Sequence, residues 1–413
     1  MESDLGSVCA TPLVDTTQSI DMNHFVEIGK MRVGIDASNI RDGGGLTHLV
    51  EMLSAVRPEQ HGIEKVLVWS GRSILDKLPQ RPWLRLIHDP LLDGPLPSRL
   101  FWQRFRLTGL AMHNCELLFV PGGTYVGSFR PFVTMSRNLL PFDPDERRRY
   151  GLSWRHLRYI LLESMQSNTF RRASGVIFLT QIARQVVERR IGLIPGKVAI
   201  VPHGISKSFQ RPPQNQYPLS VYSVNRPFRW LYVSVVNFYK HQWHVAEAIA
   251  RLRQKGIPVE LELVGPAYPP ALDRLREVIS KIDPKEEFIH YVGPVPYQKL
   301  ASHYHHADGF VFASSCETFG QILLEAMASG LPIACSNRSA MPEILGDAGV
   351  YFDPENLREI VEALYTLMVA PDLRKRLAQA AYERALQYSW ERCARETFSF
   401  LADVARGASV KDG

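Results

Sequence analysis

The sequence from Ala313 to Pro332 reads ASSCETFGQILLEAMASGLP and joins two short apolar runs, Gly309–Phe312 and Leu331–Cys335. Apolar runs of this length with β-branched or aromatic residues are typical of buried strands. Between the two runs we expect a helix with Thr318 as its N-cap, and Gln321 completes the pattern of a capping box. The stretch therefore predicts a strand–helix–strand unit, the repeating unit of a parallel sheet.

The predicted helix has an unusual distribution of polar residues. It should end at Gly330, because glycine favours the left-handed C-cap conformation and Pro332 cannot continue a helix. Its polar residues are Gln321, Glu325 and Ser329, which are spaced four residues apart on one narrow stripe. A surface helix has the opposite proportions, with a broad polar face. We therefore expect the helix to be mostly buried, with its stripe directed at something other than bulk water.

Two carboxylates mark this unit: Glu317 lies just before the helix and Glu325 lies within it, with seven residues between them. Open parallel sheets bind ligands beyond the carboxyl ends of their strands, where Glu317 falls. The backbone N–H groups of Phe319, Gly320 and Gln321 would form an anion site, and the glycine would let a phosphate come close. Glutamates at this spacing also occur on solvated helix faces, so the spacing alone leaves both interpretations open.

The sequence from Glu317 to Pro354 resembles the signature of the retaining glycosyltransferases of family 4, the glycosyl transferases group 1. The resemblance lies in ETFG, four further residues and EAMASGLPI, followed by Ser336, MPEI and GDAGVYFDP. It is strongest over residues 230–355 and extends over residues 31–405. It implies the GT-B fold, an α/β architecture in which two Rossmann-like, doubly wound parallel-sheet domains face a central cleft. It also implies an enzyme that uses a nucleotide-diphospho-sugar as substrate and needs no metal or other cofactor.

Length and composition agree with a soluble protein of two domains. A chain of 413 residues exceeds one ordinary hydrophobic core, and its 45% hydrophobic and 22% charged residues are typical of globular proteins. No run of 18 apolar residues occurs and the N-terminus lacks an apolar signal segment, so neither a transmembrane helix nor secretion is expected. The five cysteines are scattered without a C-x-x-C pair, which argues against zinc and disulfides and for a reducing cytosol.

The domain organisation follows from apolar periodicity and from a Pro-, Gln- and Asn-rich stretch in mid-chain. We expect strands at 31–37, 65–69, 84–88, 117–120, 132–135, 175–178, 198–201, 230–236, 260–264, 289–292, 309–312 and 331–335. The predicted parts are a mobile tail at 1–30, an N-terminal acceptor-binding domain at 31–205 completed by a C-terminal helix at 389–406, a linker at 206–228 and a C-terminal nucleotide-sugar-binding domain at 229–388.

A triple glycine, Gly43-Gly44-Gly45, connects the first predicted strand to the first predicted helix. It is not G-x-G-x-x-G, which argues against a dinucleotide-dependent oxidoreductase. Gly44 and Gly45 could let a pyrophosphate approach the start of the helix, or they could form a plain flexible turn. The resemblance favours the first interpretation, because a glycine-rich loop of the family faces the donor here.

Two positions of the N-terminal domain concern the cleft. Arg137 and Asn138 follow a predicted strand where many family members have a His-Asp pair, so either could contact the donor or the acceptor. His203 lies in VPHGI, which is similar to the strand-end turn of the family. We expect it at the cleft too, in contact with either the donor or the acceptor.

In the C-terminal domain, Lys240 matches the lysine that the family places on the donor phosphates. The arginine that usually precedes it by five residues is Val235 here. We therefore expect phosphate neutralisation to depend on Lys240 and backbone amides, with Asn237 or Arg338 as further candidates.

The resemblance implies a role for each main site residue. Glu317 would hold hydroxyls of the donor sugar and orient its anomeric carbon, and Glu325 would accept hydrogen bonds from the ribose. Lys240 would stabilise the leaving diphosphate, whose charge grows in the transition state. Pro294 and Val295 would contact the nucleotide base through backbone groups, so the sequence does not predict the base. The enzyme would transfer a hexosyl-type sugar from a GDP- or UDP-sugar to a glycan or a polyprenyl-linked acceptor, in surface polysaccharide, lipopolysaccharide or glycolipid synthesis.

The excess of basic residues lies in the first 205 residues, which hold 25 Lys/Arg against 19 Asp/Glu. From Arg147 to Arg172 there are seven arginines interleaved with aromatic and aliphatic residues, and Phe101–Arg106 could extend this patch. Such a segment could bind an anionic membrane or could be an ordinary solvated helix. No nucleic-acid-binding motif accompanies it, so no nucleic-acid partner is expected. The predicted location is the cytoplasm, at the inner face of the cell membrane.

Two other classes of function remain open. A nucleotide-sugar epimerase would not be expected to show the paired glutamates. A non-catalytic protein of the GT-B fold could bind carbohydrate or membrane without turnover. The departures at Val235 and at Arg137-Asn138 are compatible with this second class, whereas Glu317, Glu325 and Lys240 argue against it.

Overall fold

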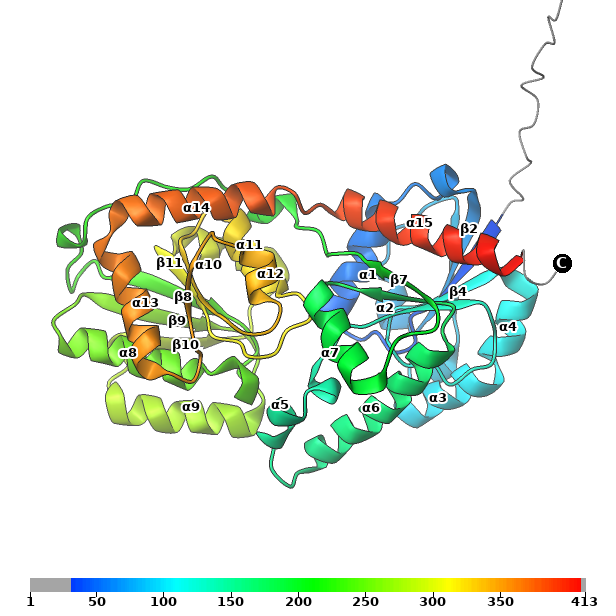
Figure 1. Ribbon diagram of the computed structural model, residues 1–413, viewed down its shortest axis with the longest axis horizontal. Coiled ribbons are helices and arrows are strands. Elements are labelled where there is room, and N and C mark those ends of the chain that lie inside the picture. Colours follow the sequence, from blue (N-terminus) through cyan, green and yellow to red (C-terminus); the bar gives the residue numbers. More distant parts are fainter. Residues whose placement is uncertain (1–30, 410–413) are drawn as a thin grey trace, which may run out of the picture.

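The computed structural model describes residues 31–409, which fold into two halves that each contain a parallel sheet (Figure 1). The predicted tail at 1–30 lies outside the described residues. The first sheet has the strand order β3-β2-β1-β4-β5-β6-β7 and the second has the order β10-β9-β8-β11-β12-β13. In each sheet the chain starts at an inner strand, moves to one edge, returns beside the first strand and moves to the other edge. Both sheets are thus doubly wound, which confirms the predicted fold class.

The N-terminal half contains seven strands and seven α-helices among the described residues. They are β1 (Met31–Asp36), α1 (Gly43–Ala55), β2 (Ile63–Ser70), α2 (Arg72–Leu75), β3 (Leu84–His88), α3 (Leu96–Phe105), α4 (Leu107–Asn114), β4 (Leu117–Val120), β5 (Phe132–Met135), α5 (Pro144–Arg148), α6 (Trp154–Arg172), β6 (Gly175–Phe178), α7 (Gln181–Ile191) and β7 (Lys197–Ile200).

The C-terminal half contributes six strands and is followed by a long final helix. Its elements are β8 (Phe228–Val233), α8 (Gln242–Gln254), β9 (Val259–Val264), α9 (Pro269–Ile282), β10 (Ile289–Gly293), α10 (Tyr297–His306), β11 (Gly309–Phe312), α11 (Gln321–Ala328), β12 (Ile333–Ser336), α12 (Met341–Leu345), β13 (Val350–Phe352), α13 (Leu357–Val369), α14 (Pro371–Ala385) and α15 (Trp390–Ser409). All twelve predicted strands are present within three residues of their predicted ends; β13 was not predicted.

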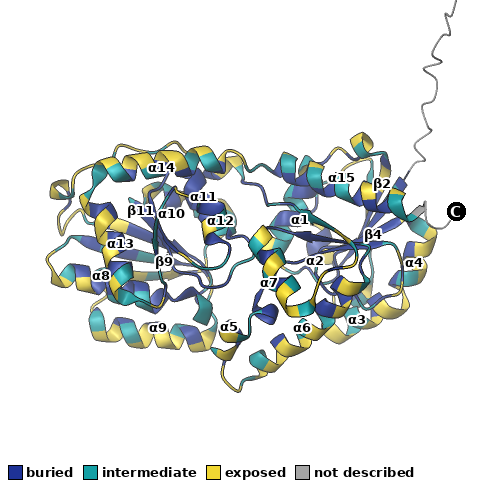
Figure 2. Ribbon diagram, in the orientation of Figure 1, coloured by how far each residue is buried: buried dark blue, intermediate teal, exposed yellow. Residues whose placement is uncertain are grey.

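Burial explains why the strands have near-continuous apolar sequences. Helices cover both faces of each sheet, so β4, β5, β6, β11 and β12 are buried at every residue. The edge strands β3 and β10 are only partly buried. In Figure 2 the buried colour follows the strands, and the exposed colour is mostly on the outer faces of the helices.

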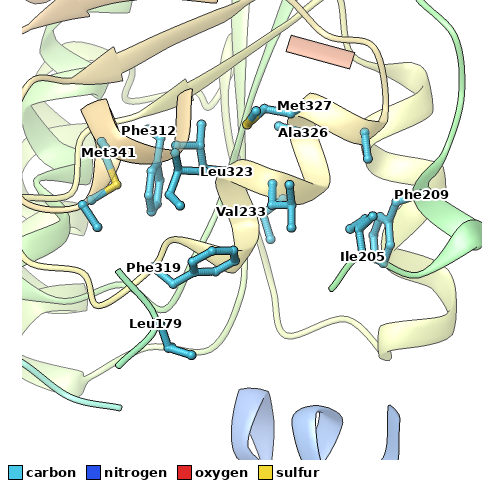
Figure 3. Packing of buried hydrophobic residues seen from close by; sticks show 14 of the residues in the cluster. Leu179, Ile205, Phe209, Val233, Phe312, Phe319, Leu323, Ala326, Met327 and Met341 are labelled. Atoms are coloured by element: carbon cyan, nitrogen blue, oxygen red, sulfur yellow. The ribbon is translucent and has the colours of Figure 1, made fainter. Parts of the chain in front are cut away.

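The helix α11 is mostly buried, as its sequence predicted, and six of its eight residues are inaccessible. Figure 3 shows Phe312 and Met341 next to Leu323 of this helix, and all three belong to one buried apolar cluster. After its last residue, Gly330 adopts the left-handed conformation with φ +66°, as predicted.

The predicted cap of this helix is wrong. The N-cap residue is Gly320, with φ +88°, and no side chain caps the helix. The chain turns at this glycine, so Thr318 lies too early to cap, and its carbonyl instead accepts a hydrogen bond from the Thr180 hydroxyl at 2.8 Å. The Gln321 side chain donates to the carbonyl of Gly204 at 3.1 Å, across to the N-terminal half.

The last helix, α15, leaves the C-terminal half and packs on α1 and β4 of the N-terminal half (Figure 1). Its start approaches the backbone of Gly204 so closely that a Cβ there would lie 2.2 Å from the backbone nitrogen of Trp390. Its buried face includes Ala394, Phe398 and Leu401. The helix therefore joins the two halves of the protein.

Candidate functional site

A cavity of about 920 Å³ lies between the two halves. Its floor is at the carboxyl ends of β8 and β11, neighbouring strands at which the chain reverses its direction across the second sheet. This reversal point is where doubly wound sheets bind ligands. Residues at the start of α1 line the opposite wall, and the loops after β9 and β10 close one end.

Glu325 of α11 lies in the cavity wall and is only 3% exposed. One carboxyl oxygen accepts a hydrogen bond from the hydroxyl of Tyr304 on α10 at 2.9 Å. Burial raises the pKa of Glu325 to about 8, although the Tyr304 hydrogen bond acts in the opposite direction. Once ionised, the Glu325 carboxylate would have acceptor capacity left, because a carboxylate can take about four hydrogen bonds.

Glu317 also lines the cavity, and its position is fixed on several sides. Its carboxylate pairs with the ammonium group of Lys240 and accepts a hydrogen bond from the Ser314 hydroxyl at 2.9 Å. Its backbone N–H donates to the Ser339 hydroxyl oxygen at 2.9 Å, and the same hydroxyl donates to the Glu317 carbonyl at 2.8 Å. A carboxylate held in this way has one well-defined orientation toward a ligand.

Lys240 is almost completely buried, with 4% of its side chain exposed. Its ammonium lies 4.9 Å from the ring centroid of Phe312 and 5.0 Å from that of Tyr239. Lys240 is not in the cavity wall itself but lies behind Glu317. The structure thus brings together the two residues that were predicted to be catalytic.

The start of α11 offers free backbone donors. The backbone N–H groups of Phe319, Gly320 and Gln321 donate no hydrogen bond to any acceptor among the described residues. Gly320 and Gln321 line the cavity, whereas the Phe319 ring is buried against His203 at 5.4 Å between centroids. Free N–H groups at a helix start favour an anionic ligand.

The triple glycine lies inside α1 and not before it, so the prediction that it connects strand to helix is wrong. Gly43 begins the helix with φ +58°, and Gly44 lines the cavity. Gly45 packs against Arg137, and a Cβ at Gly45 would be 2.9 Å from the nearer guanidinium nitrogen. The glycines thus form the first turn of a helix that points at the cleft.

The side chains of Arg137 and Asn138 have different environments. Asn138 accepts a hydrogen bond from the backbone N–H of Leu140 at 3.1 Å, which stabilises a local turn. The Arg137 guanidinium has no ion pair or hydrogen bond within residues 31–409, and its withdrawal from water lowers its pKa to about 10. His203 lines the cavity and stacks on His48 at 4.8 Å. Burial and the nearby Arg137 lower the pKa of His203 to about 3, so this imidazole is neutral.

Several predicted donor contacts lie elsewhere. The Asn237 side chain accepts hydrogen bonds from the Tyr150 hydroxyl at 2.8 Å and from the Phe238 N–H at 2.9 Å, outside the cavity wall. Arg338 is bound to Asp353 at 2.8 Å and to Glu355 at 3.4 Å. Both Asn237 and Arg338, the further candidates for neutralising the donor phosphates, therefore already have partners within the protein. After β10, Val295 lines the cavity and Pro294 does not.

The sequence did not indicate the role of two residues. Tyr304 is the hydrogen-bond partner of Glu325, and its helix shows no motif that would indicate this contact. Glu343 belongs to the MPEI segment, and its two carboxylate oxygens accept the backbone N–H groups of Gln181 and Ile182 at 2.8 and 2.9 Å. Glu343 thereby caps α7 from the other half of the protein, a contact that only the folded chain creates.

The basic segment is less free than its sequence suggested. Arg147 is buried and paired with Glu163 at 2.7 Å, and Arg149 pairs with Glu146 and Glu355, each at 2.8 Å. In the proposed extension, Trp102 and Gln103 are buried, which contradicts their assignment to a surface patch. The exposed surface of the segment is both apolar and basic. The exposed large apolar residues of α3 and α6 are Leu96, Phe101, Phe105, Trp154, Leu157, Ile160 and Leu161, and the exposed arginines of the segment are Arg104, Arg106, Arg148, Arg158 and Arg171.

Within residues 31–409, no three or more His, Cys, Asp or Glu side chains are grouped so that they could hold a metal ion. In the same part of the chain, none of the helices is long and apolar enough to cross a membrane.

Residues 222–384 match the family model for glycosyl transferases group 1. Over 115 residues the chain is 36% identical to the O-antigen chain mannosyltransferase B of Escherichia coli, which covers 28% of this chain and 30% of that protein. Over 105 residues it is 32% identical to the sulfoquinovosyl transferase SQD2 of Arabidopsis thaliana, which covers 24% of this chain and 21% of that protein. The matches thus span less than a third of each of these two relatives.

The similarity in structure extends much further than the similarity in sequence. HepE of Anabaena, solved in complex with UDP, superposes on 90% of this chain and 100% of its own with a TM-score of 0.65, at 17% identity. Two doubly wound domains with such neighbours establish the GT-B fold. The chain thus has the GT-B fold, and its residues 222–384 match the family model for glycosyl transferases group 1.

Proposed function

We propose that this protein is a retaining glycosyltransferase that takes a hexosyl-type sugar from a GDP- or UDP-sugar. The observation that carries the proposal is the position of Glu317, Glu325 and the free N–H groups of α11 in one cavity at the reversal point of the second sheet. A nucleotide-diphospho-sugar needs three binding groups. Glu325 would accept hydrogen bonds from the ribose diol, Glu317 would accept them from the donor sugar, and the N–H groups of α11 would bind the diphosphate.

The donor would lie along the floor of the cavity. Its ribose hydroxyls would donate to the Glu325 carboxylate, and its diphosphate would lie over the start of α11 near Gly320. Glu317 would then orient the sugar, with Lys240 holding that carboxylate and stabilising the charge that grows on the leaving diphosphate. The acceptor would enter from the N-terminal half, and the leaving phosphate oxygen would help remove its proton. This front-face substitution would retain the anomeric configuration and needs no metal.

The comparisons support this choice in two ways. HepE, which shares the fold, binds UDP, and the E. coli relative is a mannosyltransferase of O-antigen chains. We therefore propose a glycan or a polyprenyl-linked acceptor in surface polysaccharide or lipopolysaccharide synthesis.

The test is nucleotide release from a panel of UDP-, GDP-, ADP- and dTDP-sugars, with a membrane lipid extract as acceptor. We expect turnover of one donor, and we expect Glu317→Ala and Glu325→Ala to abolish it while both proteins stay folded. Anomeric analysis of the product by NMR would decide between retention and inversion. If no donor is turned over and neither UDP nor GDP binds, the protein is a non-catalytic member of the fold.

A polyprenyl-linked acceptor would require contact with a membrane surface. The helices α3 and α6 lie along one edge of the N-terminal half in Figures 1 and 2. Both helices carry exposed apolar residues, and Arg104 and Arg158 on them are exposed as well. Apolar side chains with flanking arginines suit the interface of an anionic bilayer. We propose that this edge docks at the inner face of the cell membrane.

Co-sedimentation with vesicles at low salt tests the docking. We expect binding to vesicles with anionic lipid, and we expect Trp154→Ser combined with Leu161→Ser to reduce it at least fivefold. Val224→Ser, which changes an exposed apolar residue of the linker, is the matched control. Equal recovery in the supernatant with neutral and anionic vesicles would exclude this surface.

A further inference from the structure

Arg137 carries a charge that no other group among residues 31–409 balances. Its guanidinium has no ion pair, hydrogen bond or aromatic partner among residues 31–409, although it is withdrawn from water enough to lower its pKa. Arg137 is partly buried, and even a partly buried charge is costly when no partner balances it. The groups near it are two neutral imidazoles, His48 and His203, which offer no countercharge. An anion that binds in the cleft would supply the missing partner.

The guanidinium lies at the start of α1. A Cβ on Gly45 would come within 2.9 Å of one of its nitrogens and within 3.3 Å of the other, so the close approach requires glycine. The N–H groups of Gly44 and Gly45 have no acceptor among the described residues, and Gly44 lines the cavity. Neither Arg137 nor Gly45 lines the cavity itself, but the Arg137 guanidinium lies against Gly45, next to Gly44 in the cavity wall. Arg137 and the positive end of a 13-residue helix thus act close to the same place.

A second observation at this place also points to a ligand. His203 is 7% exposed, lines the cavity and has an unbonded Nε2. Behind it, His48 is fully buried with both ring nitrogens unbonded. Buried polar groups normally have partners, and these imidazoles can each donate one hydrogen bond while they stay neutral.

The opposite wall of the cavity lacks a comparable cation. Val235 lines it, and Lys240 already balances Glu317. The basic residue in the described cavity wall is Lys77, which is exposed at the mouth, and the exposed Asp42 also belongs to that wall. A doubly charged group on the cavity floor would therefore have its nearest unpaired positive charge in the N-terminal half.

We propose that Arg137, the first turn of α1 and His203 form a subsite for a phosphate oxyanion, which supplies from the N-terminal half the cation that the C-terminal half lacks at Val235. The inference rests on the proposed function, because a phosphate-bearing substrate must enter the cleft. The oxyanion belongs either to the donor diphosphate or to a phosphate on the acceptor, and the two sources are separable by experiment.

The test is isothermal titration calorimetry on the full chain with UDP, GDP, the matching nucleosides and inorganic phosphate. If the oxyanion is that of the donor, Arg137→Met weakens binding of the accepted nucleoside diphosphate at least tenfold and leaves nucleoside binding within twofold. Arg137→Lys should recover part of the loss. Arg251→Met, which changes an exposed arginine of α8, is the matched control and should alter neither affinity.

If the oxyanion is that of the acceptor, nucleoside diphosphate binding is unchanged. Inorganic phosphate, titrated into protein saturated with the nucleotide, then binds wild type but not Arg137→Met. If Arg137→Met does not fold, Gly45→Ala serves instead, because its methyl group displaces the guanidinium and should cause the same losses.

Unchanged affinity for both the nucleotide and phosphate in the Arg137 variants overturns the subsite. Failure of wild type to bind any nucleotide contradicts the proposed function instead. In that case the phosphate titration still decides the subsite, because binding that depends on Arg137 supports it and binding that does not depend on Arg137, or no binding at all, overturns it.

Discussion

Glu325 combines a buried position with a proposed role, ribose binding, that would need its ionised form. Burial raises its pKa to about 8, so the carboxyl group is mostly protonated at neutral pH in the free protein. A protonated carboxyl keeps one hydrogen for donation and accepts fewer hydrogen bonds than a carboxylate. Ribose hydroxyls that donate to Glu325 would therefore favour loss of its proton, and nucleotide binding becomes linked to pH.

The affinity for a nucleoside diphosphate should rise as pH increases toward about 8, by at most about tenfold per pH unit, because binding releases one proton. Tyr304→Phe removes a hydrogen bond that lowers this pKa, so the rise should move to higher pH. The measurement is calorimetric titration between pH 6 and 9. Glutamine does not titrate, so the pH dependence that remains in Glu325→Gln comes from other groups such as the nucleotide phosphate. If the affinity of this variant depends on pH in the same way as that of the wild type, Glu325 is not the group that loses the proton.

The pair formed by Lys240 and Glu317 has both a structural and a chemical role, which substitutions can separate. Lys240→Met leaves a largely buried carboxylate without its partner, and we expect a loss of about 3 kcal/mol in the free energy of unfolding. Adding Glu317→Gln removes the unpaired charge and should restore most of the stability. Turnover should fall at least about 100-fold in the single variant and stay low in the double variant.

Chemical denaturation and initial rates of nucleotide release measure the two effects. Recovery of both stability and turnover in the double variant would show that the pair is structural only.

Among the secondary-structure elements, α15 shows how one close backbone contact joins the two halves. A methyl group on Gly204 would overlap the backbone of Ser389 and Trp390, so that the backbone would have to shift. Gly204→Ala should therefore lower the free energy of unfolding by about 1–3 kcal/mol. Gly109→Ala in α4 is the matched control, because a Cβ there meets nothing within 4 Å, and it should stabilise the protein by up to about 1 kcal/mol.

Thermal and chemical unfolding of the two variants give the comparison. A loss of stability in Gly204→Ala no greater than in Gly109→Ala would mean that α15 does not depend on this contact.

The elements differ in how well their sequences predicted them. Buried parallel strands such as β4 and β11 have continuous apolar sequences, so local composition was enough. The three-residue strand β13 is too short for a pattern, and pairing with β12 defines it. The predicted start of α11 was wrong because Gly320 adopts φ +88°, and that turn depends on the surrounding fold.

In the whole molecule, hydrogen bonds across the cleft fix the relative position of the two halves. Glu343 of the C-terminal half binds the first backbone N–H groups of α7, and Thr180 donates to the carbonyl of Thr318. A carboxylate at a helix N-terminus contributes up to about 2 kcal/mol when partly buried. These contacts should keep the cleft closed in the free protein.

Glu343→Gln should weaken this closure, because an amide is a poorer acceptor than a carboxylate at the positive end of a helix. We expect the backbone amides of Gln181 and Ile182 to exchange with deuterium about tenfold faster in the variant. Hydrogen–deuterium exchange with mass spectrometry measures this, and Glu362→Gln, an exposed glutamate of α13, is the control. Unchanged exchange at the start of α7 would contradict the role of Glu343.

The sequence predicted the main parts of the site but not how the protein balances its charges. Glu317, Glu325 and Lys240 stand in recognisable local motifs, and the structure places both glutamates in the wall of one cavity, with Lys240 paired to Glu317 behind that wall. Partners that are distant in sequence decide which charges are free. For this reason Arg338 and much of the basic segment seemed available, whereas in the structure they are engaged and Arg137 is not.

The central claim is that the cavity between the halves holds a nucleotide-diphospho-sugar with its ribose on Glu325. A crystal structure of the protein with a bound nucleoside diphosphate tests this claim most directly. We expect both ribose hydroxyls within hydrogen-bond distance of the Glu325 carboxylate and the diphosphate over the start of α11 at Gly320. A nucleotide bound outside this cavity, or inside it with no contact to Glu325 or to α11, would contradict the account.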